Sequence, residues 1–209
     1  MGSASGQGLG SSRCLIASLV VAGALTGCSL VPWGPRALAP CPGVLRSIDQ
    51  IDGEFVLQQR VRIRSGALNF PMRLVVQKTD DELVAIGFNP IGAKLFTVRQ
   101  RSSEMEVDSL PHAVSPFPPL SVLGDLHRIR FLAAPRPDGG VGVSTRSFDG
   151  TVVTDSWQAG SLVRRTLTSA DHLQPTTLTF DAGSSSVSVD NPSCGYSSDW
   201  ATVSEEAID

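Results

Sequence analysis

The clearest pattern in this chain is the strict alternation of apolar and polar residues between positions 55 and 64. Apolar side chains from Phe55 to Ile63 fall on one side of the segment, and three arginines fall on the other. A period of two predicts a strand with one buried face. Residues 68–76 repeat this period after a Ser65-Gly66 turn, so the two segments together predict a β-hairpin.

Similar strand-like runs fill most of the remaining chain and are interrupted once. After prolines at positions 116, 118 and 119, leucines recur at spacings of three and four, which predicts one amphipathic helix of about 13 residues. With the hairpin included, the sequence predicts ten strands. The further strands are expected at residues 83–88, 94–99, 105–107, 141–146, 151–158, 162–168, 176–180 and 187–189.

The proportion of strands to helix restricts the fold. One helix of this length cannot cover a flat sheet of ten strands that has a polar and an apolar face. We therefore expect a mainly β fold, in which a strongly curved antiparallel sheet forms an incomplete barrel with one or a few covering helices.

The open mouth of a curved sheet is a common site for apolar ligands. We expect a ligand cavity lined by the apolar faces of the hairpin, and a lid formed by the leucines of the helix. The alternative is that these side chains fill a closed core. The cavity residues are Leu57, Val61, Ile63, Phe70, Met72 and Leu74, and the lid residues are Leu120, Leu123 and Leu126.

The first 27 residues have the composition of a secretion signal. They contain no acidic residue and one basic residue, Arg13, followed by an apolar run that starts at Cys14. The run covers about 14 residues, whereas a transmembrane helix needs about 20. A cleaved signal is therefore the better interpretation.

The apolar run ends in Leu25-Thr26-Gly27-Cys28, which resembles the bacterial lipoprotein signal. The resemblance implies cleavage before Cys28 and attachment of acyl chains such as palmitate to that cysteine. An ordinary signal peptide followed by a chance cysteine is the alternative. The residue after Cys28 is Ser29, and an aspartate at this position would favour retention in the inner membrane. We therefore expect an outer-membrane anchor on the periplasmic face.

The remaining cysteines and the composition define the other parts of the chain. Cys41 and Cys194 predict a disulfide in an oxidising compartment, and two free thiols are the alternative. We expect a lipid anchor and Pro-rich linker at 28–43, a β domain at 44–196 and a loose acidic tail at 197–209. A net charge of −3 argues against a nucleic-acid partner.

The chain offers few groups for catalysis. Its three histidines lie in no H-E-x-x-H or paired-cysteine motif, and His127 is expected on the solvent side of the helix. The mature sequence contains no G-x-S-x-G elbow or phosphate-binding loop. We therefore expect no enzymatic activity, no cofactor and no metal.

Four arginines of the hairpin form the most concentrated positive surface of the predicted sheet. Arg60, Arg62 and Arg64 share one strand face, and Arg73 lies on the neighbouring strand. Such residues are either a solvated strand face or a surface that docks onto anionic lipid headgroups.

Three short segments carry a resemblance to a known family. Residues 85–96 (AIGFNPIGAKLF), residues 123–126 (LGDL) and residues 187–196, with Asn191 and Gly195-Tyr196, resemble an uncharacterised family of Gram-negative lipoproteins. Members of that family sit beside aryl-polyene and fatty-acid-like synthesis genes. The family is similar to the LolA/LolB carriers, whose incomplete antiparallel barrel is closed by helices and holds acyl chains on its concave side.

The resemblance covers residues 45–196 and implies a function. The expected protein is an outer-membrane-anchored periplasmic lipoprotein that binds or transfers a hydrophobic lipid or polyene. The alternative is a non-enzymatic envelope scaffold with a closed core that binds a protein partner. The sequence departs from the family after Tyr196, where Ser197-Ser198-Asp199 replace an apolar strand, so we expect the final strand to be short or displaced by Cys194.

Overall fold

The computed structural model describes residues 41, 43–110, 117–183 and 185–208, all of which belong to the unit Gly34–Asp209. The predicted signal peptide, the Cys28 lipidation site and most of the linker lie outside these residues. In chain order, the elements are η1 Ile48–Gln50, β1 Phe55–Ser65, β2 Leu68–Lys78, β3 Leu83–Phe88, β4 Lys94–Arg101, β5 Glu104–Ser109, α1 Pro119–Arg130, η2 Asp138–Gly140, β6 Gly142–Phe148, β7 Thr151–Gln158, β8 Ser161–Ser169, β9 Thr176–Phe180, β10 Ser186–Asn191, η3 Pro192–Cys194 and β11 Tyr196–Ala207.

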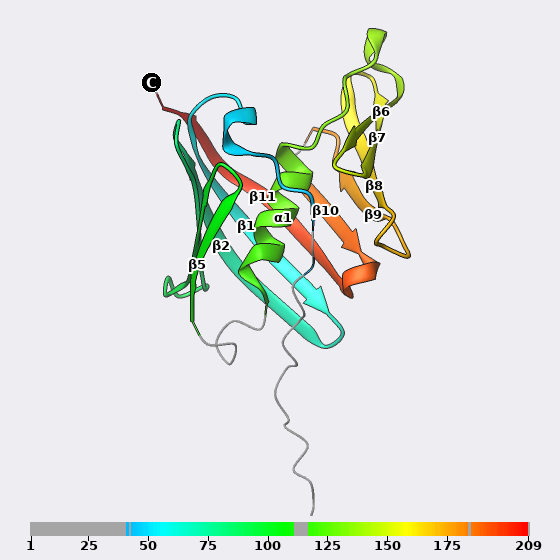
Figure 1. The fold of residues 1–209 in the computed structure, drawn as a ribbon. Coiled ribbons are helices and arrows are strands. Elements are labelled where there is room, and N and C mark those ends of the chain that lie inside the picture. The colour runs from blue at the N-terminus through cyan, green and yellow to red at the C-terminus, as the bar shows by residue number, and fades with distance from the viewer. Residues whose placement is uncertain (1–40, 42, 111–116, 184, 209) are drawn as a thin grey trace, which may run out of the picture. The chain divides into compact units, whose positions relative to one another are not determined.

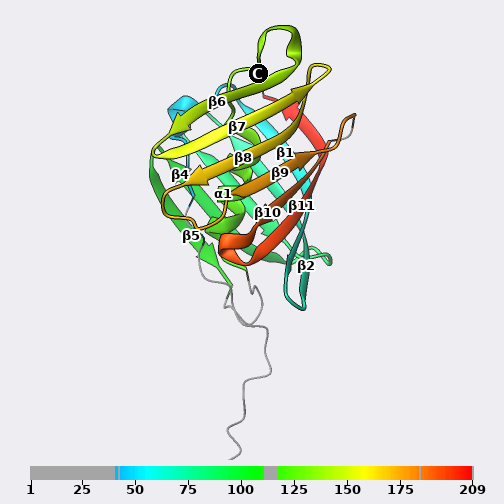
Figure 2. The same ribbon diagram turned by 90° about the vertical axis from the view of Figure 1, so that its right-hand side faces the viewer.

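All described strands belong to one antiparallel sheet (Figure 1). The strand order is β5-β4-β3-β2-β1-β11-β10-β9-β8-β7-β6, so two meanders meet where β1 pairs with β11. The edge strands β5 and β6 do not pair with each other, and the sheet curves without closing into a barrel (Figure 2). The predicted fold class, a mainly β and strongly curved antiparallel sheet with a covering helix, is confirmed.

The β1–β2 hairpin follows the alternation of the sequence. In its register Val61 pairs with Met72 and Ile63 pairs with Phe70, so the apolar faces of the two strands coincide. Gly66 closes the turn with a φ of +53°, a conformation that glycine adopts without steric cost. The hairpin thus presents one apolar face to the inside of the curve and one charged face to the outside.

Helix α1 connects β5 to β6 and lies inside the curve of the sheet (Figure 1). It begins with Pro119, whose fixed φ suits the first helical position. Its last turn carries Arg128 and Arg130, which favourably oppose the negative end of the helix dipole. Among the described residues, no helix has the length and apolar character needed to cross a membrane.

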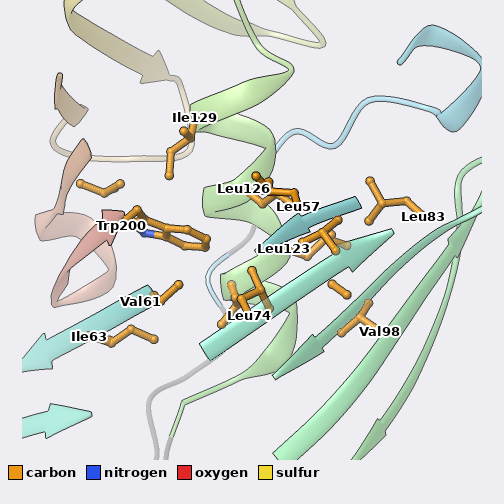
Figure 3. Close-up of a cluster of buried hydrophobic side chains, with 14 of the residues drawn as sticks. Leu57, Val61, Ile63, Leu74, Leu83, Val98, Leu123, Leu126, Ile129 and Trp200 are labelled. Carbon is orange, nitrogen blue, oxygen red and sulfur yellow. The ribbon is translucent and has the colours of Figure 1, made fainter. Parts of the chain in front are cut away.

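The core fills the space between the sheet and α1. Figure 3 shows leucines 123 and 126 of the helix pointing toward Leu57, Leu74 and Trp200 of the sheet. All five of these side chains are buried. A single continuous core therefore joins the helix to the two central strands, β1 and β11, and to their neighbours.

The predicted acidic tail at 197–209 is wrong, and so is the short final strand. The last element, β11, runs from Tyr196 to Ala207 and pairs with β1 on one side and β10 on the other. Two of its acidic side chains have basic partners, because Asp199 binds Arg64 and Glu205 binds Arg130. The charges of this segment therefore take part in cross-strand and strand–helix ion pairs. With β11 included, the described sheet has eleven strands, whereas the sequence predicts ten.

The predicted disulfide is present between Cys41 and Cys194, whose Cα atoms lie 5.7 Å apart. It joins the start of the described chain to the short turn between β10 and β11. The Cys41 backbone N–H also donates a hydrogen bond to Ser121 Oγ in the first turn of α1, at 3.2 Å. Three distant parts of the chain thus meet at this cysteine.

Candidate functional site

The predicted cavity residues lie together on the concave face of the sheet. Leu57, Val61, Ile63, Met72 and Leu74 are buried, and Phe70 is half-buried. The predicted lid residues Leu123 and Leu126 are fully buried, and Leu120 packs against the same cluster. The structure therefore unites the predicted lining and the predicted lid, and in this structure α1 occupies the concave face (Figure 3).

A buried polar network holds the middle of α1. Asp125 Oδ1 accepts hydrogen bonds from Tyr196 Oη at 2.9 Å and from Arg128 Nη1 at 2.7 Å. Its Oδ2 accepts one from Ser198 Oγ at 3.0 Å, and Trp200 Nε1 donates to that same hydroxyl at 2.8 Å. These contacts fix the helix to β11.

The network places a carboxyl group out of reach of water. Burial raises the pKa of Asp125 above its usual value, while the Arg128 guanidinium and the hydrogen bonds oppose that change. Burial likewise raises the pKa of the Tyr196 hydroxyl, which therefore stays a donor to Asp125. Removing Arg128 takes the ionic partner from the buried carboxylate of Asp125, and breaking a buried pair in this way typically costs about 3–5 kcal/mol.

A second set of contacts holds the carboxyl end of α1. The guanidinium of Arg165 on β8 donates through Nη1 to the backbone carbonyls of Arg128 at 2.6 Å and Ile129 at 3.1 Å. It also forms a bidentate ion pair with Asp155 on β7, with distances of 2.7 and 2.9 Å. Both side chains are fully buried, so this pair caps the helix from the β6–β11 half of the sheet.

The prediction that His127 faces solvent is wrong. His127 is fully buried, its Nδ1 accepts the backbone N–H of Arg46 at 3.0 Å, and its Nε2 lies 3.0 Å from Gln100 Oε1. The helix is enclosed on all sides between Ser121 and Ile129, so it has no solvent face there. Its polar residues are instead satisfied by the segments that surround it.

Sequence reasoning missed the polar residues that position α1. They come from four distant elements, and no short motif links them; they are Asp125, Arg128, Asp155, Arg165, Tyr196 and Ser198. One signal was present, because Asp125 lies directly between residues of the apolar stripe of the predicted helix. A charged residue in that position indicates a buried partner.

The described residues hold no group of three or more His, Cys, Asp or Glu side chains that would bind a metal ion. Of the three histidines, His112 lies outside the described residues, and His127 and His172 are in separate parts of the fold.

Comparisons with known proteins find similarity among solved structures. No known protein family matches the sequence, and no curated protein matches it closely enough to count as a relative. Among solved structures, the chain is similar to the crystal structure of a domain from Vibrio parahaemolyticus that is named as an outer membrane lipoprotein-sorting protein domain. The two share 14% sequence identity at a TM-score of 0.41, over 77% of this chain and 87% of that chain.

Proposed function

We propose that this chain is a lipoprotein of the cell envelope that binds a hydrophobic molecule, an acyl lipid or a polyene, against the concave face of its sheet. Its anchor is the acylated Cys28, on the periplasmic face of the outer membrane. The protein acts by burying its ligand and carries out no covalent chemistry. The observation that supports this best is a continuous apolar concave face that is covered by one helix of 12 residues.

The shape of the core explains how binding would work. Leu123 and Leu126 of α1 lie on the sheet as an acyl chain would lie there, so a ligand that displaces the helix finds an apolar surface already formed. Each square ångström of apolar surface removed from water contributes about 25 cal/mol. A long acyl chain therefore binds without any strong polar contact.

A helix as short as α1 depends on its packing against the sheet, because it is only marginally stable outside a folded protein. A ligand that takes the place of α1 on the sheet must therefore replace the apolar contacts of the helix with the core. Displacement also breaks the hydrogen bonds of Asp125 with β11 and those of Arg165 with the last carbonyls of the helix. In this proposal the closed form described above is the empty carrier, and its affinity for ligand depends on how often α1 leaves the sheet.

A second function, an envelope scaffold that keeps a closed core and binds a protein partner, is favoured by the same polar contacts. They fix α1 at two points, and both contain buried ion pairs. The two functions differ in one respect that can be measured: a carrier holds a hydrophobic molecule and a scaffold does not.

The test weakens the closed form at one hydroxyl group. The variant Ser198→Ala removes the donor to Asp125 and also the acceptor of Trp200 Nε1. Only the bond to Asp125 joins β11 to the helix, and its loss costs about 1 kcal/mol. Because a less stable closed form raises the open fraction, we expect its affinity for a fluorescent fatty acid to rise about fivefold. Ser188→Ala is the matched control, since Ser188 Oγ donates to Asp199 at 3.1 Å on the exposed face of the sheet.

Native mass spectrometry of the purified protein supplies the second measurement. Under the carrier function, lipid copurifies with the unchanged protein, the fluorescent fatty acid binds with a stoichiometry of one, and Ser188→Ala leaves its affinity unchanged. If neither the unchanged protein nor Ser198→Ala binds fatty acid, and no lipid copurifies, the carrier function is excluded and the scaffold remains.

A further inference from the structure

The convex face of the sheet carries a trough that the concave site does not use. It has a volume of about 820 Å³. Its floor is formed by neighbouring segments of β2, β1, β11 and β10, and the turns after β3 and after β9 border it. The side chains that β1 presents here, Arg60 and Arg62, point away from the concave face that holds Val61 and Ile63.

Three arginines give this trough its charge: Arg60, Arg62 and Arg73. All three are exposed, and Arg60 lies directly opposite Arg73 in the β1–β2 ladder. Like charges in this position destabilise a sheet. The arrangement therefore has an unfavourable interaction that an anion between the two guanidinium groups would relieve.

The trough is also lined by two acidic residues, and Asp199 lies directly opposite Arg62 in the β1–β11 register. Asp199 binds Arg64 and accepts a hydrogen bond from Ser188, and Asp181 on the rim has contacts of its own. The predicted arginine surface thus loses Arg64, which is neutralised.

Clustering in one trough distinguishes these arginines from the other exposed ones, since Arg136, Arg146 and Arg164 also form no ion pair among the described residues. Other arginines of the sheet and helix are paired. Arg99 and Arg101 both bind Glu82, and Arg130 binds Glu205. In the described part of the chain, Arg60 and Arg62 form no ion pair, although Asp199 lies opposite Arg62, and the guanidinium of Arg73 lies 5.3 Å from the centre of the Phe88 ring. An arginine pair without acidic partners, next to a third arginine, is suited to bind an oxyanion through several parallel N–H donors.

Apolar residues border the same trough. Ile91, in the turn after β3, has 90% of its side chain exposed, and Pro71 and Pro90 beside it are also exposed. A free phosphate ion would gain nothing from these groups. Basic residues next to exposed apolar ones match the region of a lipid where the phosphate meets the glycerol and the acyl chains.

We propose that this trough binds the phosphate headgroup of an anionic membrane lipid, through Arg60, Arg62 and Arg73. The site lies on the face opposite the concave core, so it does not depend on whether that core accepts a ligand. It would give the domain a contact with the bilayer surface in addition to its lipid anchor.

The test measures vesicle binding without the acyl anchor. The sheet, α1 and the disulfide all lie between Cys41 and Ala207, so the chain from Ser29 onward contains the whole described fold. We compare vesicles of phosphatidylcholine alone with vesicles that also contain phosphatidylglycerol. The variant with Arg60→Gln, Arg62→Gln and Arg73→Gln should bind the anionic vesicles about a hundredfold more weakly, since each basic residue near the surface contributes roughly fivefold.

The control variant removes the same charge elsewhere, with Arg99→Gln, Arg101→Gln and Arg146→Gln. The proposal predicts that this control binds almost as the unchanged chain does, and that added salt weakens binding to anionic vesicles only. Thermal unfolding separates binding from folding: the variant loses both the Arg60–Arg73 repulsion and the Arg73 contact with the Phe88 ring, and because these changes oppose each other it should melt close to the unchanged chain.

Three results would overturn the proposal. The first is that the unchanged chain shows no preference for anionic vesicles. The second is that the control variant loses as much affinity as the trough variant, which would show that net charge alone determines binding. The third is displacement of the chain from vesicles by inorganic phosphate at a matched ionic strength, which would assign the arginines to a free anion.

Discussion

At the residue scale, His127 shows how the enclosed helix accommodates a titratable group. Its Nδ1 accepts the Arg46 backbone N–H, so the ring is neutral and donates through Nε2 to Gln100. Burial, and then the charges of Arg46 and Arg128, lower the pKa of His127 to about 3. Protonation would break the first hydrogen bond and bury a cation beside two others.

This residue predicts a loss of stability in acid. In the unfolded chain a histidine titrates near its usual pKa of 6.5, well above the folded value. The stabilisation is therefore complete above pH 6.5, declines as the pH falls toward 3, and is absent below it; its full size is about 5 kcal/mol. Urea unfolding across this range measures it.

The control for this prediction is His127→Gln, which keeps a donor for Gln100 and does not titrate. We expect this variant to be less stable than the unchanged protein at neutral pH, with a shallower decline in its free energy of unfolding between pH 6.5 and 3. Equal slopes for the two proteins would show that His127 is not the group responsible.

At the element scale, β11 is where sequence and structure differ most. The strand joins the two meanders of the sheet, yet its sequence contains three acidic residues and few large apolar ones. Only Tyr196 and Trp200 contribute large buried side chains, and the residue between them on the same face is Ser198. A serine is suitable there because it donates to Asp125 of the helix.

Ending the chain after Tyr196 tests the role of this strand. We expect that truncated protein not to fold, because β1 and β10 would each lose β11 as a neighbouring strand and the core would lose Trp200. A chain that ends after Ala207 keeps the strand and should retain its fold. Circular dichroism and thermal unfolding of the two proteins distinguish the structural strand from the loose tail that composition alone predicts.

The same comparison shows what could be predicted from sequence. The β1–β2 hairpin was predictable because local alternation fixes both its face and its register, and α1 was predictable from its leucine spacing. Strand β11 and the contacts of Asp125 and Arg165 were not, because each depends on partners from distant segments. The apolar lining of the concave face was predictable, but its occupation by α1 depends on how those distant polar contacts assemble.

At the scale of the whole molecule, one sheet separates two different surfaces. Its concave face is apolar and covered by α1, and its convex face carries the arginine trough. If Cys28 is acylated, the chain between it and Cys41 reaches at most about 45 Å, which lets the domain approach the bilayer while it stays tethered. The two proposed sites thus differ in the part of a lipid that they recognise, the acyl chain in one and the headgroup in the other.

The disulfide carries the last prediction, because it connects the start of the described fold to the turn between β10 and β11. Cys41 and Cys194 are separated by 153 residues, and closing a loop of that size stabilises a folded chain by up to about 5 kcal/mol. We expect the double variant Cys41→Ser and Cys194→Ser to lose up to this amount in urea unfolding, and a reductant to destabilise only the unchanged protein. A reductant that lowers the stability of both proteins equally would show that the cross-link contributes nothing.

If the prediction holds, the cross-link also stabilises α1, since Cys41 donates to Ser121 in its first turn and Asn191 donates to the Cys41 sulfur at 3.3 Å. Reduction should then raise the affinity for a fluorescent fatty acid as Ser198→Ala does, because both changes release the helix from the concave face.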